Sequence, residues 1–167
     1  MSSRVRSGGL SGRDWGTDRG RTRVNQRHQL DDAEKCEVKK RLRELLAARS
    51  EVRFAYLHGS FLGADRFGDV DVAVSVERGS LSAADRTTYE LDLEAVLERG
   101  LGLPVDVRVI EDTPPSFRYA VTLGEELFVR DREAWAMFRE RTWNEYLDFA
   151  PLREEALRDL ARHLRRN

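Results

Sequence analysis

The chain has 167 residues, of which 40% are hydrophobic and 35% are charged, and its formal net charge is −1. This length suits one domain with a buried core rather than two full-sized domains. No stretch approaches the roughly 18 apolar residues of a membrane span, and a single cysteine, Cys36, excludes an intrachain disulfide. Because the amino terminus also lacks the apolar core of a secretion signal, we expect a cytoplasmic protein that needs no membrane.

Residues 1–30 differ in composition from the rest of the chain. They hold seven Arg and two Asp, a charge of +5, which leaves −6 for the remainder. They are rich in Gly, Ser, Arg and Thr and cannot bury enough apolar surface to offset the entropy of ordering. We therefore predict a disordered basic tail over 1–30. A nucleic-acid-binding arm is the alternative, but the acidic remainder makes nucleic acid an unlikely main partner.

The first predicted helix begins at Asp31 or Asp32, either of which can cap it, and ends near Ser50. Its apolar residues recur at helical spacing, so it is expected to pack on a sheet. Cys36 has no Cys or His partner at metal-ligand spacing, and we expect it to be at least half-buried. A strand is predicted over 52–57. Gly59-Ser60 then ends it, turning the backbone into a short helical loop.

Two carboxylates mark the second strand, predicted over 69–76. Side chains alternate along a strand, so Asp69 and Asp71 share one face while Val70 and Val72 point into the core. Neighbouring carboxylates repel each other unless a cation lies between them. Carboxylate oxygens suit Mg²⁺, which keeps several waters and completes its octahedron with phosphate oxygens. The pattern therefore favours a site for a metal and a nucleoside triphosphate.

A third strand carries another aspartate. Ser82 begins the helix before it, with Asp85 placed as in a capping box. Glycines at 100 and 102 and Pro104 end that helix. The strand over 104–110 alternates between valines and polar residues, and Asp106 lies on its polar face. Asp106 can therefore face the same way as the first two aspartates.

The remainder of the chain is predicted as a short helix from Pro114-Pro115 to Val121, a brief strand over 124–129, and helices beyond it. Trp135 and Trp143 lie on the first of these last helices. Packing on the chain's own core is favoured for Trp135, whereas core packing and a partner-facing role are equally favoured for Trp143. Pro151 interrupts, and a highly charged helix is predicted over 151–167.

This order of elements resembles the nucleotidyltransferase fold of the DNA polymerase β superfamily, in particular the minimal (MNT-type) nucleotidyltransferases. The resemblance covers residues 31–149 and depends on Gly59-Ser60, Asp69-Val70-Asp71 and Val105-Asp106-Val107. It implies an α/β fold, with a small mixed β-sheet flanked by helices and with carboxy-terminal helices. The nucleotidyltransferase domain is then 31–150, followed by the helix at 151–167. Family members often have ten residues between the Gly-Ser and the paired aspartates, whereas this chain has eight, 61–68.

The small size and the aromatic carboxy-terminal region are similar to the antitoxin branch of these enzymes. The resemblance implies a protein adenylyltransferase that moves AMP from ATP to a tyrosine hydroxyl of a cognate HEPN-type RNase toxin. It also implies a hetero-oligomer with that toxin. Two alternatives stay open: a nucleotidyltransferase acting on a small molecule, as aminoglycoside nucleotidyltransferases do, and an antitoxin that binds and occludes its toxin without catalysis.

Each candidate site residue has an expected role in nucleotidyl transfer. Asp69 and Asp71 are expected to bridge two Mg²⁺ ions, and Asp106 to complete the ion beside the acceptor hydroxyl and take its proton. Gly59 and Ser60 are assigned to the β- and γ-phosphates. The plainer alternatives are solvated edge-strand charges and an ordinary strand-ending turn.

Two further side chains have weaker assignments. Arg66, in the connecting loop, is expected to add a phosphate contact, and a solvated loop arginine is as well supported. His58 stands beside the turn. There a hydrogen-bonded packing histidine is favoured over a ligand or base.

Overall fold

The computed structural model describes residues 27–77, 79, 81–111, 113–149, 151 and 158. The predicted tail lies outside the described residues up to residue 26, and the predicted helix at 151–167 lies outside them except at 151 and 158. In chain order the elements are α1 (Asp32–Ala47), β1 (Val52–His58), α2 (Ser60–Gly63), β2 (Val70–Val76), α3 (Ala83–Leu101), β3 (Val105–Val109), α4 (Pro115–Thr122), β4 (Glu125–Val129) and α5 (Arg132–Asp148).

The four strands form one mixed sheet in the order β3-β2-β1-β4. β1 pairs antiparallel with β2 and with β4, whereas β2 and β3 are parallel. A parallel pair needs a crossover connection, and α3 provides it. The predicted α/β fold with a small mixed sheet is therefore confirmed.

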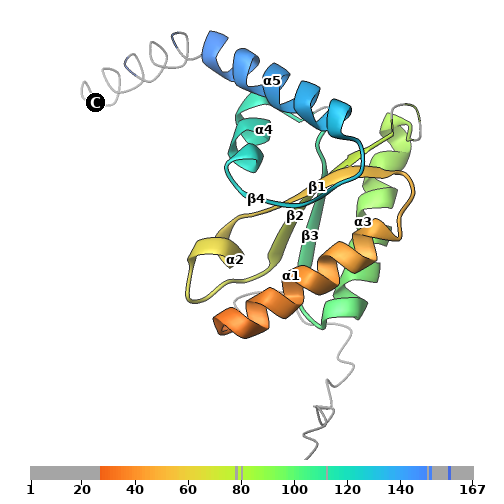
Figure 1. Cartoon of the computed structure of the whole chain (residues 1–167), viewed down its shortest axis with the longest axis vertical. Helices are drawn as coiled ribbons and strands as arrows, with labels where there is room; N and C mark the ends of the chain where they lie inside the picture. The colour runs from red at the N-terminus through yellow and green to blue at the C-terminus, as the bar shows by residue number, and fades with distance from the viewer. Residues whose placement is uncertain are drawn as a thin grey trace, which may run out of the picture.

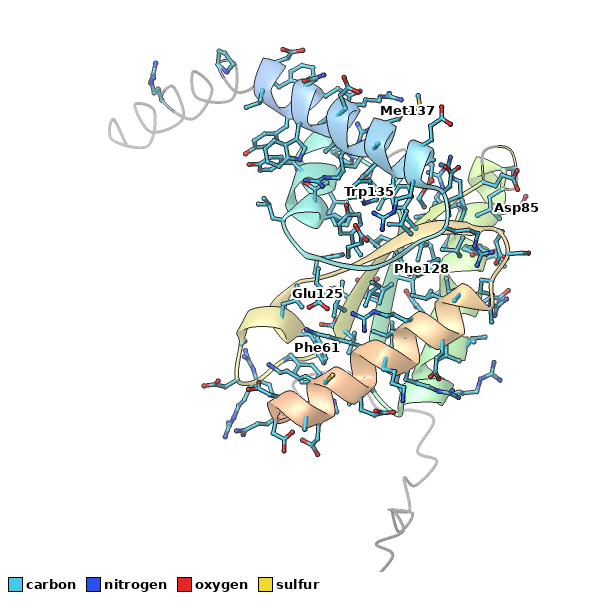
Figure 2. The ribbon with its side chains drawn as sticks, viewed as in Figure 1. Phe61, Asp85, Glu125, Phe128, Trp135 and Met137 are labelled. Atoms are coloured by element: carbon cyan, nitrogen blue, oxygen red, sulfur yellow. The ribbon has the colours of Figure 1, made fainter. Side chains whose placement is uncertain are left out.

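Helices cover both faces of the sheet (Figure 1). On one face, α1 and α3 bury the valines of β2 and β3 together with leucines such as Leu42 and Leu97. On the other face, α4 and α5 cover a smaller cluster that includes Phe54 and Tyr56. Trp135 points from α5 toward the sheet (Figure 2) and donates from Nε1 to the Tyr56 hydroxyl at 2.8 Å. The packing role predicted for Trp135 is confirmed.

Local sequence signals account for the helix ends. The Asp31 carboxylate accepts from the Glu34 N–H at 2.8 Å, and the Glu34 carboxylate accepts from the Asp31 N–H at 2.9 Å, which forms a capping box. Ser82 caps α3, as predicted, and Gly102 ends it in the left-handed conformation, with φ of 69°. The expectation for Cys36 was wrong: its side chain is exposed on α1. None of the described helices combines the length and apolarity needed to cross a membrane.

Three glutamates of α3 close the free edge of β3. Spaced four residues apart, they form a ladder along one side of the helix. Their carboxylates accept from successive outward N–H groups of the strand: Glu90 from Val109 at 2.8 Å, Glu94 from Val107 at 3.1 Å and Glu98 from Val105 at 3.3 Å. Exposed strand edges invite pairing with other chains, so this glutamate ladder keeps β3 from adding a foreign strand.

Removing one rung should destabilise the chain without changing its site. Glu94→Ala leaves the Val107 N–H to water, and we expect it to lower the free energy of unfolding by about 0.5–1.5 kcal/mol. Asp92→Ala, on an exposed position of the same helix, is the matched control. Denaturant unfolding measures both variants, and equal midpoints would show that the rung contributes nothing.

Candidate active site

The three aspartates predicted to bind metal lie on one face of the sheet. Asp71 is the second residue of β2 and Asp106 the second residue of β3, and the parallel register pairs them directly. Residues opposite each other on neighbouring strands project to the same face. Asp69 immediately precedes β2 and is two residues from Asp71. The structure thus brings Asp106 beside Asp71, which lies 35 positions earlier in the sequence.

The three aspartates are close enough for their charges to affect one another. The pKa of Asp71 is raised to about 6, first by burial and then by the negative charges of Asp69 and Asp106. A carboxyl group surrounded in this way ionises at a higher pH than a solvent-exposed one. A divalent cation shared by these groups would remove both the repulsion and the cost of the buried charge.

The donor chemistry therefore fits Mg²⁺, which prefers carboxylate oxygens and keeps sites open to water and phosphate. As they stand, no three His, Cys, Asp or Glu side chains in the described part of the chain are gathered closely enough to hold a metal ion. The assignment of Asp69, Asp71 and Asp106 as metal ligands accordingly stays a prediction.

Gly59 and Ser60 form the turn between β1 and α2, next to Asp71. Gly59 has φ of 76° and ψ of −160°, a conformation essentially restricted to glycine. A Cβ atom on Gly59 would overlap Oδ2 of Asp71. Ser60 is the exposed first residue of α2. Because α2 has only four residues, its dipole is small, and any phosphate binding must depend on direct donation from this turn.

The loop between α2 and β2 is anchored from two sides. Phe61 and Phe67 are buried and contact each other edge to face, with ring centroids 4.9 Å apart. Phe67 also exchanges two backbone hydrogen bonds with His28, of 2.7 and 3.0 Å. Lys35 of α1 donates to the Ala64 carbonyl at 3.1 Å. Arg66 is exposed on this loop, and its predicted phosphate contact stays untested.

His58 ends β1 in register with Asp71, one strand away from it. Its ring packs edge-on against Phe117 of α4, with centroids 5.6 Å apart. The packing part of the prediction is confirmed, whereas the structure shows no hydrogen-bond partner for the buried Nε2 atom among the residues that it describes. Burial lowers the pKa of His58, and the charge of Asp106 opposes this shift. The imidazole is therefore half-buried and lies between the aspartates and α4.

Reasoning from the sequence missed Arg108. It lies on β3 two residues after Asp106, and its Nη2 atom approaches Oδ1 of Asp106 at 3.6 Å. The alternation of the strand places 106 and 108 on one face, so the spacing was a signal for this contact.

A cavity of about 700 Å³ lies away from the aspartates, toward the opposite ends of β2 and β3. Its lining includes Arg53, Ser75, Glu111 and Arg118. Arg53 and Ser75 both donate to Glu111, at 3.3 and 2.6 Å. These paired charges form a polar network between the sheet and α5, and none of the predicted site residues contributes to it.

The raised pKa of Asp71 predicts a specific dependence of stability on pH. A carboxyl whose pKa is higher in the folded chain binds its proton more tightly there, so its stabilising contribution is complete below about pH 4 and is lost as the pH rises through about 6. Asp71→Asn cannot ionise. With a chelator present to remove divalent cations, we expect the melting temperature of Asp71→Asn to rise relative to that of the wild type between pH 4 and pH 8.

Thermal unfolding at unit steps of pH checks this expectation. Asp65→Asn, at an exposed position of the neighbouring loop, is the control and should follow the wild type. A difference between Asp71→Asn and wild type that stays constant with pH would contradict the assigned electrostatics.

Comparisons with known proteins agree with this geometry. The family model described as polymerase beta nucleotidyltransferase matches residues 40–133. A search of curated proteins finds no match. Among solved structures, a chain from the complex of a tri-AMPylated Shewanella oneidensis HEPN toxin with an MNT antitoxin is 19% identical, with a TM-score of 0.59; the match covers 76% of this chain and 98% of that one.

Two further structures are similar. A toxin–antitoxin complex with AMP-PNP contains a chain that is 20% identical, with a TM-score of 0.60 and coverage of 74% of this chain and 98% of that one. A Shewanella oneidensis protein is 16% identical, with a TM-score of 0.55 and coverage of 79% and 99%. Identities this low show a shared fold. The family model, by contrast, spans more than half of the chain, and this chain belongs to the polymerase beta nucleotidyltransferase family.

Proposed function

We propose that this chain is an antitoxin that transfers AMP from ATP to a tyrosine hydroxyl of a cognate HEPN-type toxin in the cytoplasm. The observation that carries the proposal is the register of β2 and β3, which places Asp106 beside Asp71. The Asp71 carboxylate in turn lies against Gly59 of the Gly59-Ser60 turn. The chain also spans nearly the whole length of matched chains from MNT antitoxin complexes, one of which contains an AMPylated toxin.

The reaction is an in-line displacement at the α-phosphorus. A bond forms between the tyrosine oxygen and that phosphorus, the bond to the oxygen bridging the β-phosphorus breaks, and pyrophosphate leaves. Positioning and charge neutralisation supply most of the catalysis. Two bound Mg²⁺ ions, held by Asp69, Asp71 and Asp106, would supply the neutralising charge.

The residues of the chain have separate tasks in this proposal. Gly59, lacking a side chain, lets a phosphate approach the backbone beside Asp71. Ser60 donates its N–H and hydroxyl to the β- and γ-phosphates, with Arg66 as a further contact. Asp106 accepts the proton of the attacking hydroxyl. His58 and Phe117 close the side of the site that faces α4.

Labelled transfer tests the proposal. The purified chain is incubated with Mg²⁺, ATP labelled at the α-phosphate and the HEPN-type protein encoded next to its gene. Label should appear on a tyrosine of that partner, as mass spectrometry of its peptides can show. Transfer to an aminoglycoside alcohol alone would support the small-molecule alternative.

Occlusion is distinguished by the Asp69→Asn, Asp71→Asn double variant. If the double variant binds the toxin and still protects cells, without any label on the partner, then occlusion replaces catalysis as the mechanism. If it binds but fails to protect, then transfer is what silences the toxin.

A further inference from the structure

Arg108 is held on the same face of β3 as Asp106 and contacts it directly. The two residues are separated by one position, and Arg108 lies opposite Ala73 of β2, two residues beyond Asp71. The guanidinium Nη2 is 3.6 Å from Oδ1 of Asp106, and the two side chains are 53% and 41% exposed. Arg108 therefore occupies a place from which it reaches one of the predicted metal ligands.

A second carboxylate anchors Arg108 from α3. Its Nη1 lies 3.4 Å from Oε2 of Glu90, whose side chain is 9% exposed. The other oxygen of Glu90 accepts the Val109 N–H at 2.8 Å, as the last rung of the glutamate ladder. Glu90 is thus fixed by burial and by the strand backbone. Arg108 spans the distance from this fixed anchor to the more exposed Asp106.

A guanidinium and a divalent cation both bind ionised carboxylate oxygens. We propose that Arg108 is a positioning residue that competes with the divalent cation for Asp106, with Glu90 retaining the arginine when the cation binds. The inference rests on the proposed function, because it takes Asp106 as a metal ligand. It adds a residue that sets how readily the metal site is completed.

The expected change in cation affinity is set by how exposed the Arg108–Asp106 ion pair is. Ion pairs between solvent-exposed side chains are weak, and breaking this one should change cation affinity by about twofold to fivefold. Removing the competitor should strengthen binding. A residue that merely supported the fold would weaken metal binding when lost, so the direction of the change separates the two roles.

Manganese titration of the full chain, followed by the electron paramagnetic resonance signal of free Mn²⁺, measures this directly. Arg108→Met should bind Mn²⁺ about twofold to fivefold more tightly than the wild type. Arg99→Met makes the same change of charge at an exposed site of α3, where Nε of the arginine donates to the Ala95 carbonyl. This control should leave the Mn²⁺ affinity unchanged. Equal or weaker binding by Arg108→Met overturns the inference.

Side-chain NMR gives a readout that long-range charge effects do not move. The Arg108 Nε–H resonance, assigned by its loss in Arg108→Met, should change on adding Mg²⁺ to the wild type, while that of Arg99 should not. An Arg108 signal unaffected by saturating Mg²⁺ would overturn the inference and leave the proposed function intact. If the wild type binds no Mn²⁺ at all, the metal-dependent function fails together with it.

Discussion

Changing Asp69 and Asp71 to asparagine should reduce AMP transfer by at least about a hundredfold, since groups that stabilise charge in a transition state contribute on that scale. The substitution keeps the size and shape of both side chains but removes two of the three negative charges that face the predicted metal site. Transfer of labelled AMP to the proposed HEPN-type partner, under single-turnover conditions, measures the loss. The fold should survive, because Asp71 is a source of repulsion in the folded chain at neutral pH.

The control for this double variant is Asp65→Asn, which removes an exposed charge from the loop that precedes the same strand. Asp65→Asn should transfer AMP at the wild-type rate in the same assay. If the double variant then kept more than a tenth of that rate, the paired aspartates would not be the metal ligands that catalysis needs.

Gly59→Ala should disable the site and destabilise the fold together. Its φ of 76° and ψ of −160° lie in a region that side-chain-bearing residues adopt only at a cost of about 1–3 kcal/mol. The added Cβ also overlaps Oδ2 of Asp71, so either that carboxylate or the turn must move. We expect a lower unfolding midpoint and the loss of measurable binding of a non-hydrolysable ATP analogue, the first followed by denaturant and the second by calorimetry.

Gly63→Ala is the matched control, because a Cβ at Gly63 meets no atom within 4 Å and its backbone has no positive φ. It should bind the analogue as the wild type does. Unchanged nucleotide binding in Gly59→Ala would remove the turn from the phosphate site, whatever happened to stability.

The site and the edge of the sheet are linked through one side chain. Glu90 closes β3 by accepting the Val109 N–H, and it also holds Arg108 beside Asp106. A change at Glu90 is therefore expected to alter both stability and the predicted metal site. A change at Glu94, whose carboxylate accepts the Val107 N–H, is expected to alter stability. Glu90 thus belongs both to the glutamate ladder and to the surroundings of the predicted metal site.

Local signals in the sequence were sufficient to predict the helices and strands that the structure describes. Capping by Asp31 and Ser82, the strand break at Gly59 and the alternation of valines each depend on residues within a few positions of one another. Such interactions form in the same way wherever the segment lies, so they can be recognised without knowledge of the fold. The same alternation placed Asp69 and Asp71 on one face and predicted a polar face for Asp106.

Tertiary structure alone decided which of these faces meet. Strand order and the parallel register of β2 and β3 set Asp106 beside Asp71, and burial on that face raised the pKa of Asp71. The contact of Arg108 with both Glu90 and Asp106, and the packing of His58 on Phe117, likewise arise between separate elements. The physical reason is that pairing, burial and charge interactions depend on distances through space, and these exist only once α3 has carried the chain back to the sheet.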